Sequence, residues 1–238
     1  MKILSVICAR SGSKGLKNKC VTRIGDKMVI EYSIDYSLSL GNDVKTVVST
    51  DIDEVITYCK VNGVDYIARD ESLCGDNTKI EDVLADAIKK KGRGRTCCSL
   101  VYGNIPVRYP RMFHKAVRFL EDNIDYDAVI SMQRVEKFHP DWMFPYNNGL
   151  LPKMEEVHYR RQSLSPKMIP DGHTLLFKIR KFVTKHKGIR PYRKEYRYSI
   201  FGDKIRSLTT DKLIIDIDTK KDLHLAEAFL QAKRSYKK

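Results

Sequence analysis

Long apolar runs are missing from this sequence, and its cysteines and histidines lack the spacing of metal or redox sites. No run reaches the length of about 18 apolar residues that a membrane-spanning helix needs, so we expect no transmembrane helix. The six cysteines have no C-x-x-C spacing, and the six histidines are scattered. We therefore interpret the cysteines as reduced thiols of a cytoplasmic protein and expect neither disulfides nor a zinc site.

Three common catalytic or phosphate-binding motifs are also absent. The chain contains neither G-x-x-x-x-G-K-[ST] nor G-x-G-x-x-G, which argues against a Walker-type or a dinucleotide-type phosphate site. It has no G-x-S-x-G sequence either, so a serine nucleophile of the hydrolase type is not indicated.

Acidic residues are in the minority: 30 Asp and Glu oppose 44 Lys and Arg, which gives a net charge of +14. This excess indicates an anionic partner, but leaves nucleic acid, nucleotides, acidic sugars and anionic membranes open. Nine basic residues fall between positions 178 and 197, where only Glu195 opposes them. We interpret that segment as a solvated face or an oligomer contact, because aromatic residues are not interleaved with its basic residues in a recognisable RNA motif.

What the sequence does contain is an alternation of short β-branched runs with segments of helical length. This alternation predicts βαβ units and an α/β fold with a mostly parallel sheet. Residues 135–200, rich in Pro, Tyr, Arg and Lys, break the alternation, and we interpret them as an inserted hairpin or dimerisation arm in a single domain spanning 1–238. Strands are predicted at 2–9, 44–49, 64–68, 96–102, 128–132 and 212–217, and helices at 28–40, after 51, and at 78–90, 110–123 and 220–233.

The loop after the first predicted strand is the strongest local signal. Ligands of open α/β sheets bind beyond the carboxyl ends of the strands. The loop carries two glycines, which let backbone N–H groups approach phosphates, and the cations Arg10, Lys14 and Lys17. We interpret it as a phosphate site; the alternative is a solvated basic turn.

Two further groups of charged residues suggest chemistry. Asp216 and Asp218 lie two apart in a predicted strand, so their carboxylates point to the same side and suit Mg²⁺ on a substrate phosphate. The alternative is that Asp218 or Thr219 caps the last helix. Arg160 and Arg161 could clamp a carboxylate or phosphate, and the alternative for them is a salt-bridged surface.

Taken in order, these motifs resemble those of the CMP-N-acylneuraminate synthetases (acylneuraminate cytidylyltransferases). The stretch 9–18 resembles the family's A-R-x-x-S-K-G-…-K-N loop, although it is two residues shorter between Gly15 and Lys17. The stretch 216–223 resembles D-I-D-T-x-x-D-L. Between them lie, in order, Val48-Ser49-Thr50-Asp51, Ala68-Arg69, Asp76-Asn77-Thr78, Asn104-Ile105-Pro106-Val107-Arg108 and Arg160-Arg161-Gln162.

The resemblance implies an enzyme with a Rossmann-like α/β fold that forms a homodimer through an exchanged arm. Such an enzyme transfers CMP from CTP to an acidic nine-carbon sugar, releases pyrophosphate, uses Mg²⁺, and has neither a nucleic-acid nor a membrane partner. The nucleotide would be bound by Ala9, Arg10, Gly12, Ser13, Lys14, Lys17, Asn18, Arg69 and Thr78.

The resemblance also implies the remaining roles. Asp216 and Asp218 would hold the metal and act in catalysis together with Lys17 and Arg161. We expect Arg161 to steady charge, because the pKa of an arginine is too high for a base. The sugar would contact Tyr102, Asn104, Gln162, Asp171 and His173.

Departures from the family pattern bear on the substrate. Tyr102 stands where many members have Gln, and Asp171-Gly172-His173 stands where they have N-G-A or N-G-S. An acid of the legionaminic or pseudaminic type is therefore as consistent with the sequence as sialic acid. The alternatives are a nucleotidyltransferase for another sugar or NTP and a basic nucleic-acid-binding protein, in which the paired aspartates would repel a phosphate backbone unless a metal intervened.

Overall fold

A seven-stranded sheet forms the centre of the molecule in the computed structural model, which describes residues 1–12, 15–144, 160–189, 196 and 198–235. The strand order is β5-β4-β1-β6-β8-β7-β9, and β8 is the one strand of this sheet that runs antiparallel to its neighbours. None of the helices in the described part of the chain has the length and apolar character needed to cross a membrane. The strands are β1 (Ile3–Ala9), β4 (Val44–Thr50), β5 (Tyr66–Ala68), β6 (Cys97–Tyr102), β7 (Ala128–Arg134), β8 (Met168–Lys178) and β9 (Ile205–Thr210), with a separate hairpin of β2 (Arg23–Ile24) and β3 (Lys27–Met28).

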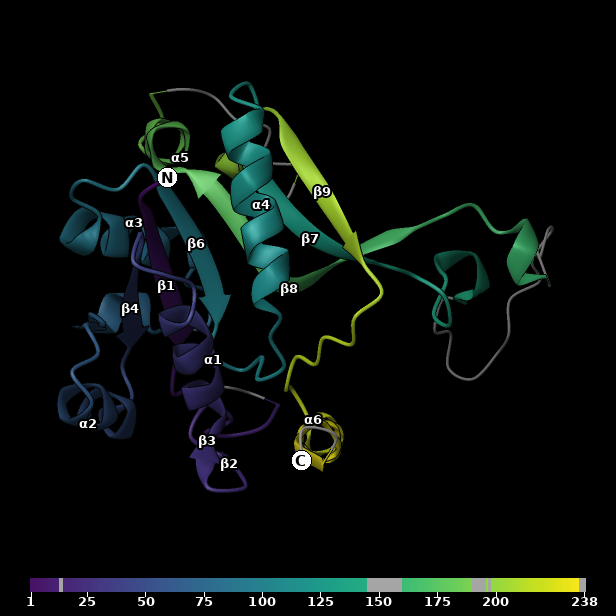
Figure 1. Cartoon of the computed structure of the whole chain (residues 1–238), viewed down its shortest axis with the longest axis horizontal. Coiled ribbons are helices and arrows are strands. Elements are labelled where there is room, and N and C mark those ends of the chain that lie inside the picture. The colour runs from purple at the N-terminus through teal and green to yellow at the C-terminus, as the bar shows by residue number, and fades with distance from the viewer. Residues whose placement is uncertain (13–14, 145–159, 190–195, 197, 236–238) are drawn as a thin grey trace.

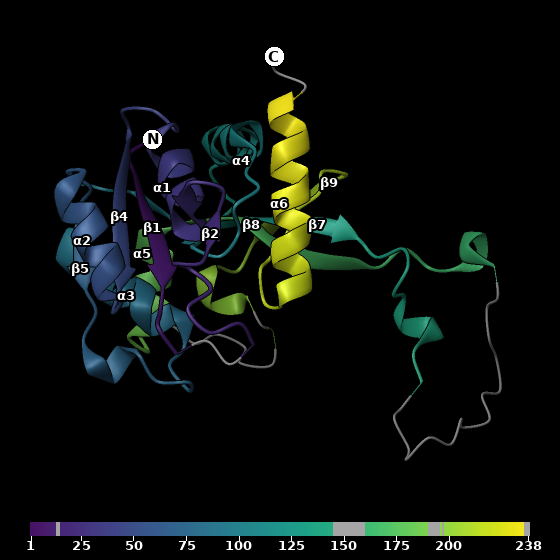
Figure 2. The ribbon, with the colours of Figure 1, turned by 90° about the horizontal axis from the view of Figure 1, so that it is seen from below.

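Helices cover both faces of this sheet, as Figures 1 and 2 show. Every residue of β1 is buried, which explains why its sequence is apolar at every position except Ser5 and does not alternate. One face packs against α1 (Val29–Leu38), α2 (Asp53–Val61) and α4 (Pro110–Asp122). The other packs against α3 (Ile80–Lys91) and α5 (Ile179–His186), and α6 (Lys220–Ser235) forms a smaller core with the segment around Ile215.

The predicted insertion at 135–200 is too long. Its second half contains β8, which lies between β6 and β7 in the main sheet, and α5, which covers that sheet. The sequence obscures β8 because Pro170, Asp171 and Gly172 are poor strand formers. Pro170 is tolerated because the ladder between β7 and β8 shifts register there.

The described residues of the insertion that leave the sheet are 135–144 and 160–167, and we call them the arm. They project away from the sheet in both views (Figures 1 and 2). Its base continues the ladder of β7 and β8, because the Val135 amide donates to the carbonyl of Lys167 at 2.9 Å. Further out, His139 Nε2 lies 2.9 Å from the carbonyl oxygen of Ser165, which joins the two legs.

The predicted strand at 212–217 is wrong: these residues form no strand, and the sheet ends instead with β9 at Ile205–Thr210. The segment is nevertheless extended enough to bury Ile215 and Ile217 and to expose Asp216 and Asp218. The Ile217 amide donates to the carbonyl of Asn104 at 3.0 Å, which fixes the segment beside the loop after β6.

Candidate active site

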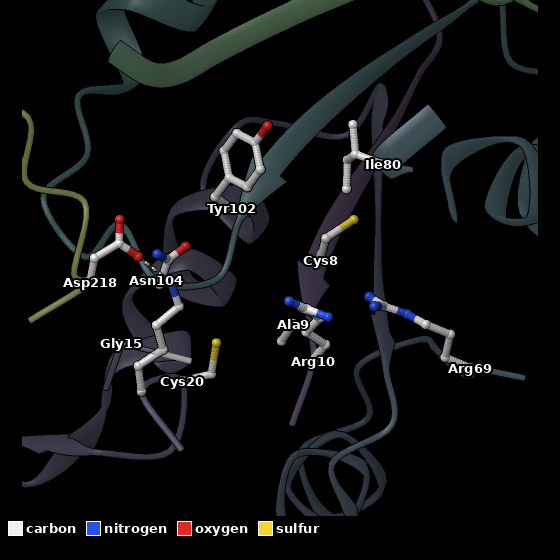
Figure 3. A pocket seen from close by; sticks show the side chains of 11 residues that line it. Cys8, Ala9, Arg10, Gly15, Cys20, Arg69, Ile80, Tyr102, Asn104 and Asp218 are labelled. Carbon is white, nitrogen blue, oxygen red and sulfur yellow. Dashed lines mark hydrogen bonds and ion pairs between the residues drawn. The ribbon is translucent and has the colours of Figure 1, made fainter. Parts of the chain in front are cut away.

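A cavity of about 370 Å³ opens at the carboxyl ends of β1, β5 and β6. In Figure 3, Asp218 and Asn104 stand on one side of it, Arg69 and Ile80 on the other, and Ala9 and Arg10 between them. This is the place where open α/β sheets bind ligands. The lining residues are Cys8, Ala9, Arg10, Gly15, Lys19, Cys20, Arg69, Ile80, Tyr102, Asn104 and Asp218.

The loop after β1 is fixed at its start by side chains from two neighbouring segments. Ser11 donates its amide to Asp51 Oδ1 at 3.0 Å and its hydroxyl to Asp51 Oδ2 at 2.6 Å. Arg10 Nη1 lies 3.0 Å from Asp76 Oδ1 and donates to the carbonyl of Gly75 at 3.1 Å. These bonds orient the Arg10 guanidinium toward the cavity that it lines.

The end of the same loop is a tight turn that depends on Asn18. Its φ of +55° is in the left-handed region, which asparagine tolerates better than most residues. Its carbonyl accepts from the amides of Val21 and Thr22 at 2.9 and 3.0 Å, so Asn18 shapes the loop. Gly12, Lys17, Asn18 and Thr78 do not line the cavity, and Ser13 and Lys14 lie outside the described residues.

Arg69 supplies the second guanidinium of the cavity. Its Nη2 donates to the carbonyl of Ser49 at 2.7 Å and its Nε to the Ser49 hydroxyl at 3.2 Å. Both acceptors are neutral, so the positive charge of Arg69 is held in place without being neutralised by them. Two arginines held by short bonds to the backbone make the cavity suitable for a phosphorylated ligand.

The two predicted metal carboxylates lie beside the cavity, with Asp218 in its lining. Asn104 Nδ2 donates to Asp216 and, at 3.2 Å, to the carbonyl of Ile217. Partial desolvation by the surrounding protein, followed by the negative charge of Asp218, raises the pKa of Asp216 above its usual value. A Cβ at Gly15 would clash with the carbonyl oxygen of Asp218, so only glycine lets the loop approach the carboxylates this closely.

Lys19 is a cavity residue that the sequence motifs did not single out. Its Nζ lies 2.6 Å from Asp218 Oδ1, and the lysine side chain is 18% exposed. The only sequence signal for Lys19 was that it is the fourth basic residue of the loop, after Arg10, Lys14 and Lys17. The structure thus places a cation directly on one of the two carboxylates.

The alternative role predicted for the stretch 216–223, a cap of the last helix, applies to Thr219 and Asp222. Thr219 precedes α6, and its hydroxyl accepts from the Asp222 amide at 3.3 Å. Asp222 Oδ2 in turn accepts from the Thr219 amide at 2.7 Å, which completes a reciprocal cap of the helix. Thr219 and Asp222 therefore start the helix, and Asp216 and Asp218 are left to face the cavity region.

The donor set at this place fits a hard divalent cation. The described residues contain no cluster of three or more His, Cys, Asp or Glu side chains arranged to hold a metal ion. Asp216 and Asp218 would therefore supply two carboxylates, with phosphate and water oxygens completing the coordination, which is how Mg²⁺ commonly binds with nucleotides. The raised pKa of Asp216 fits this reading, because two nearby carboxylates gain from an added positive charge.

Two thiols line the cavity without being activated. Cys8 and Cys20 are both buried, and burial raises the pKa of each to about 11. They are therefore neutral thiols near pH 7 and act as small apolar lining rather than as nucleophiles.

Of the predicted sugar contacts, Tyr102 and Asn104 line the cavity, whereas His173 does not. His173 is buried: its Nε2 accepts from the Tyr109 amide at 2.8 Å, and its Nδ1 lies 2.7 Å from Thr174 Oγ1. Desolvation and then Arg108 lower its pKa to about 3, so the ring is neutral. Both ring nitrogens are bonded within the chain, and a contact between His173 and the sugar stays a prediction.

Asp171 also lies outside the cavity lining. Its Oδ1 accepts from the Ser131 hydroxyl and, at 2.9 Å, from the His173 amide. Its Oδ2 is buried and has no hydrogen-bond partner among the described residues. Asp171 thus positions the start of β8 in this structure, and a sugar contact at this residue stays a prediction.

Arg161 and Gln162 lie in a short 3₁₀ helix, Arg161–Ser163, on the arm. This helix lies on the part of the chain that projects away from the sheet in both views (Figures 1 and 2). The roles predicted for Arg161 and Gln162 stay predictions, and the two residues do not line the cavity of the same chain.

A comparison with known families decides the class of the protein. A family model described as Cytidylyltransferase matches residues 4–235. The chain belongs to the cytidylyltransferase family. This membership confirms the family resemblance of the motifs and the expectation of a nucleotidyltransferase.

The names of several curated relatives of this cytidylyltransferase refer to acidic sugars. The N-acylneuraminate cytidylyltransferase of Escherichia coli O18:K1:H7 (strain RS218 / NMEC) is 26% identical over 99% of this chain and 54% of its own length. That of Streptococcus agalactiae serotype V is 30% identical over 72% of this chain and 42% of its own length. The CMP-N,N'-diacetyllegionaminic acid synthase of Campylobacter jejuni subsp. jejuni serotype O:2 is 35% identical over 40% of this chain and 42% of its own length. The chain thus spans about half the length of these relatives.

Solved structures confirm the fold of this cytidylyltransferase. A CMP:2-keto-3-deoxy-manno-octonic acid synthetase complexed with CTP is similar with a TM-score of 0.74 at 16% identity, over 98% of this chain and 100% of that chain. A 4-diphosphocytidyl-2C-methyl-D-erythritol synthase from Anaerococcus prevotii DSM 20548 has a TM-score of 0.65 at 16% identity, over 96% of each chain. At these identities the likeness concerns the fold alone: a mostly parallel, Rossmann-like sheet flanked by helices.

Proposed function

We propose that this cytidylyltransferase transfers CMP from CTP to an acidic nine-carbon sugar of the sialic, legionaminic or pseudaminic type and releases pyrophosphate. One observation carries the proposal: a single cavity brings Arg10, Arg69 and Lys19 together with the carboxylate of Asp218. Cations suit the triphosphate, and the carboxylates suit the divalent cation that accompanies it. The names of the curated relatives support the choice of sugar.

In this mechanism, the anomeric hydroxyl of the sugar attacks the α-phosphorus of CTP, and pyrophosphate leaves. Arg10 and Arg69 would bind the triphosphate and hold it in line for attack, because both guanidinium groups are fixed by bonds to the surrounding backbone. Lys17 would add charge from the same loop. Asp216 and Asp218 would hold Mg²⁺, which when bound neutralises phosphate charge and orients the reacting group.

Tyr102 and Asn104 would lie between the two substrates. Tyr102 is the last residue of β6 and Asn104 lies just beyond it, and both line the same cavity as the arginines. Asn104 is already bonded to Asp216 and to the Ile217 carbonyl, so it would couple the position of the carboxylates to the sugar. The location of the protein would be the cytoplasm, a choice that its six free cysteines support.

We also propose that the enzyme is a homodimer in which the arm of one chain reaches the cavity of the other. The arm exposes large apolar side chains, since Phe138 is 73%, Met143 55% and Phe144 45% exposed. Exposed apolar residues grouped on a projecting segment are typical of an interaction surface. In such a dimer, Arg161 and Gln162 would reach the partner's cavity, where Arg161 would steady phosphate or carboxylate charge.

The dimer is tested by the double variant Phe138→Asp with Phe144→Asp. We expect the double variant to be monomeric, because charges replace the apolar contact of the arm. It should still unfold cooperatively on heating, as a folded chain does. Size-exclusion chromatography with light scattering measures the change. The matched control is Ile124→Asp, which alters an equally exposed apolar residue (84%) outside the arm and should leave the dimer intact. A monomeric wild-type protein, or a dimeric double variant, contradicts the exchanged arm.

The activity itself is tested by pyrophosphate release from CTP with a panel of nonulosonic acids. We expect release with at least one acid of the sialic, legionaminic or pseudaminic type, and loss of release on exhaustive chelation by EDTA. Parallel reactions with ATP, GTP and UTP test the nucleotide base. Pyrophosphate release with another NTP and the phosphate ester of a neutral sugar, but never with CTP and a nonulosonic acid, would favour the alternative of a different sugar nucleotidyltransferase.

A further inference from the structure

The ion pair between Lys19 and Asp218 joins the loop after β1 to the segment that carries the two carboxylates. The two residues lie near opposite ends of the sequence, and Lys19 Nζ is 2.6 Å from Asp218 Oδ1. The lysine side chain is 18% exposed, whereas that of Asp218 is 66% exposed. The lysine side chain is thus largely covered by protein, and its ammonium pairs with a carboxylate that remains open to the cavity.

We propose that Lys19 is an exchangeable cation of the site: it occupies the Asp218 carboxylate until a divalent cation binds there, and then transfers its ammonium to an oxygen of the triphosphate. This inference rests on the proposed function, because it assumes that Asp216 and Asp218 hold the cation. Its assignment to Lys19 comes from the contacts of this chain.

Charge repulsion favours the exchange. A divalent cation on Asp218 would lie within a few ångströms of the ammonium that now bonds Oδ1, and the two positive charges would repel each other. The lysine side chain is only 18% exposed, so an anionic partner would stabilise its ammonium in both states. A triphosphate bound in the same cavity would supply such an anion.

Lys19 is the cation of the cavity that is best able to move. Arg10 is tied to Asp76 and the Gly75 carbonyl, and Arg69 is tied to Ser49. A lysine carries a compact charge on a flexible four-carbon stem, so its ammonium can swing between two anions while its backbone stays in place. The backbone is held, since the close approach of Gly15 to the Asp218 carbonyl keeps the loop against the carboxylate segment.

The first experiment measures binding rather than turnover. Lys19→Met keeps the length of the side chain and removes its charge. We expect Mn²⁺ without nucleotide to bind at least about threefold more tightly, because Asp218 is freed from an ion pair of ordinary strength. We expect CTP in EDTA to bind about tenfold more weakly, because a charge-assisted bond to phosphate is lost. Electron paramagnetic resonance measures free Mn²⁺, and calorimetry measures CTP.

Two variants serve as controls. Lys27→Met removes another lysine that pairs with an aspartate, Asp35, outside the cavity, and both affinities should stay unchanged. Lys19→Arg keeps the charge and should return Mn²⁺ affinity toward that of the wild type. A general loss of structure in Lys19→Met would weaken both ligands together, so affinity changes of opposite sign distinguish the exchange from damage.

A measurement on the unchanged protein does not depend on any variant. Acetic anhydride labelling with mass spectrometry reports how free the Lys19 ammonium is. We expect Mg²⁺ alone to raise the labelling of Lys19 and Mg²⁺ with CTP to lower it again. Unchanged labelling and unchanged affinities in Lys19→Met, while the wild type binds Mn²⁺ and CTP, overturn this inference alone. A wild-type protein that binds neither ligand overturns the proposed function and the inference with it.

Discussion

Asp218→Asn is expected to lower kcat/KM for pyrophosphate release by between about 10² and about 10⁴, because a metal-held charge on phosphate contributes several kcal/mol to the transition state. The amide keeps the size of the carboxylate but removes its negative charge. The fold should survive, because the side chain is 66% exposed and the reciprocal cap of α6 is made by Thr219 and Asp222. Steady-state kinetics with CTP and the accepted sugar acid measures the loss.

The matched control for this substitution is Asp26→Asn. Asp26 is an exposed aspartate in the turn between β2 and β3, away from the cavity lining, and its replacement should leave kcat/KM within about twofold of the wild-type value. The Mn²⁺ affinity of Asp218→Asn should also fall, in contrast to that of Lys19→Met. An Asp218→Asn enzyme that retains more than a tenth of wild-type activity would remove Asp218 from the metal site.

Arg108→Ala is expected to lower the free energy of unfolding by about 4 kcal/mol, because it removes three hydrogen bonds that the buried, charged side chain donates to backbone carbonyls. The Arg108 side chain donates to the carbonyls of Ile105 at 2.9 Å, His173 at 2.7 Å and Tyr102 at 2.7 Å. It thereby joins the end of β6 to the start of β8. Burial lowers the pKa of this guanidinium to about 10, which still leaves it charged at neutral pH.

Thermal unfolding provides the measurement for Arg108. In a domain of this size, 1 kcal/mol shifts the melting temperature by about 2–4 °C, so the expected loss is about 10 °C. Arg111→Ala on the first turn of α4 is the control, because this arginine is exposed and its loss should shift the melting temperature by less than about 2 °C. An Arg108→Ala protein that melts with the wild type would show that these three bonds do not contribute to stability.

The central strands could be predicted from the sequence because their burial is symmetrical. Ile3–Ala9 and Cys97–Tyr102 lie in the interior of the sheet with helices on both faces, so both strands are apolar apart from one buried serine each, Ser5 and Ser99. Edge strand β9 escaped prediction because only part of it is buried, and Arg206, Ser207 and Thr209 give it the composition of a loop. The choice of 212–217 instead was wrong because a period of two describes any extended segment, whether or not it pairs.

The sequence could predict those site residues that lie at or just after the end of a strand or in a recognisable motif. Six residues proposed from the sequence, Ala9, Arg10, Arg69, Tyr102, Asn104 and Asp218, line one cavity. His173 could not be placed in this way, because its burial depends on Tyr36 and Tyr109, whose rings lie 5.7 and 6.0 Å from it and come from distant elements. Lys19 was missed for a similar reason, since its partner is Asp218 at the other end of the chain.

The ladder between β7 and β8 has a consequence for how this enzyme can change over evolutionary time. The two strands pair from Ala128 with Phe177 to Arg134 with Met168, so the two ends of the arm are held together by the sheet. Residues can be added or removed beyond this ladder without altering the distance that the arm must span, and the entropy of closing a longer loop rises only slowly. The arm can therefore change in length without moving the strands that position Arg10 and Arg69 in the cavity of the same chain.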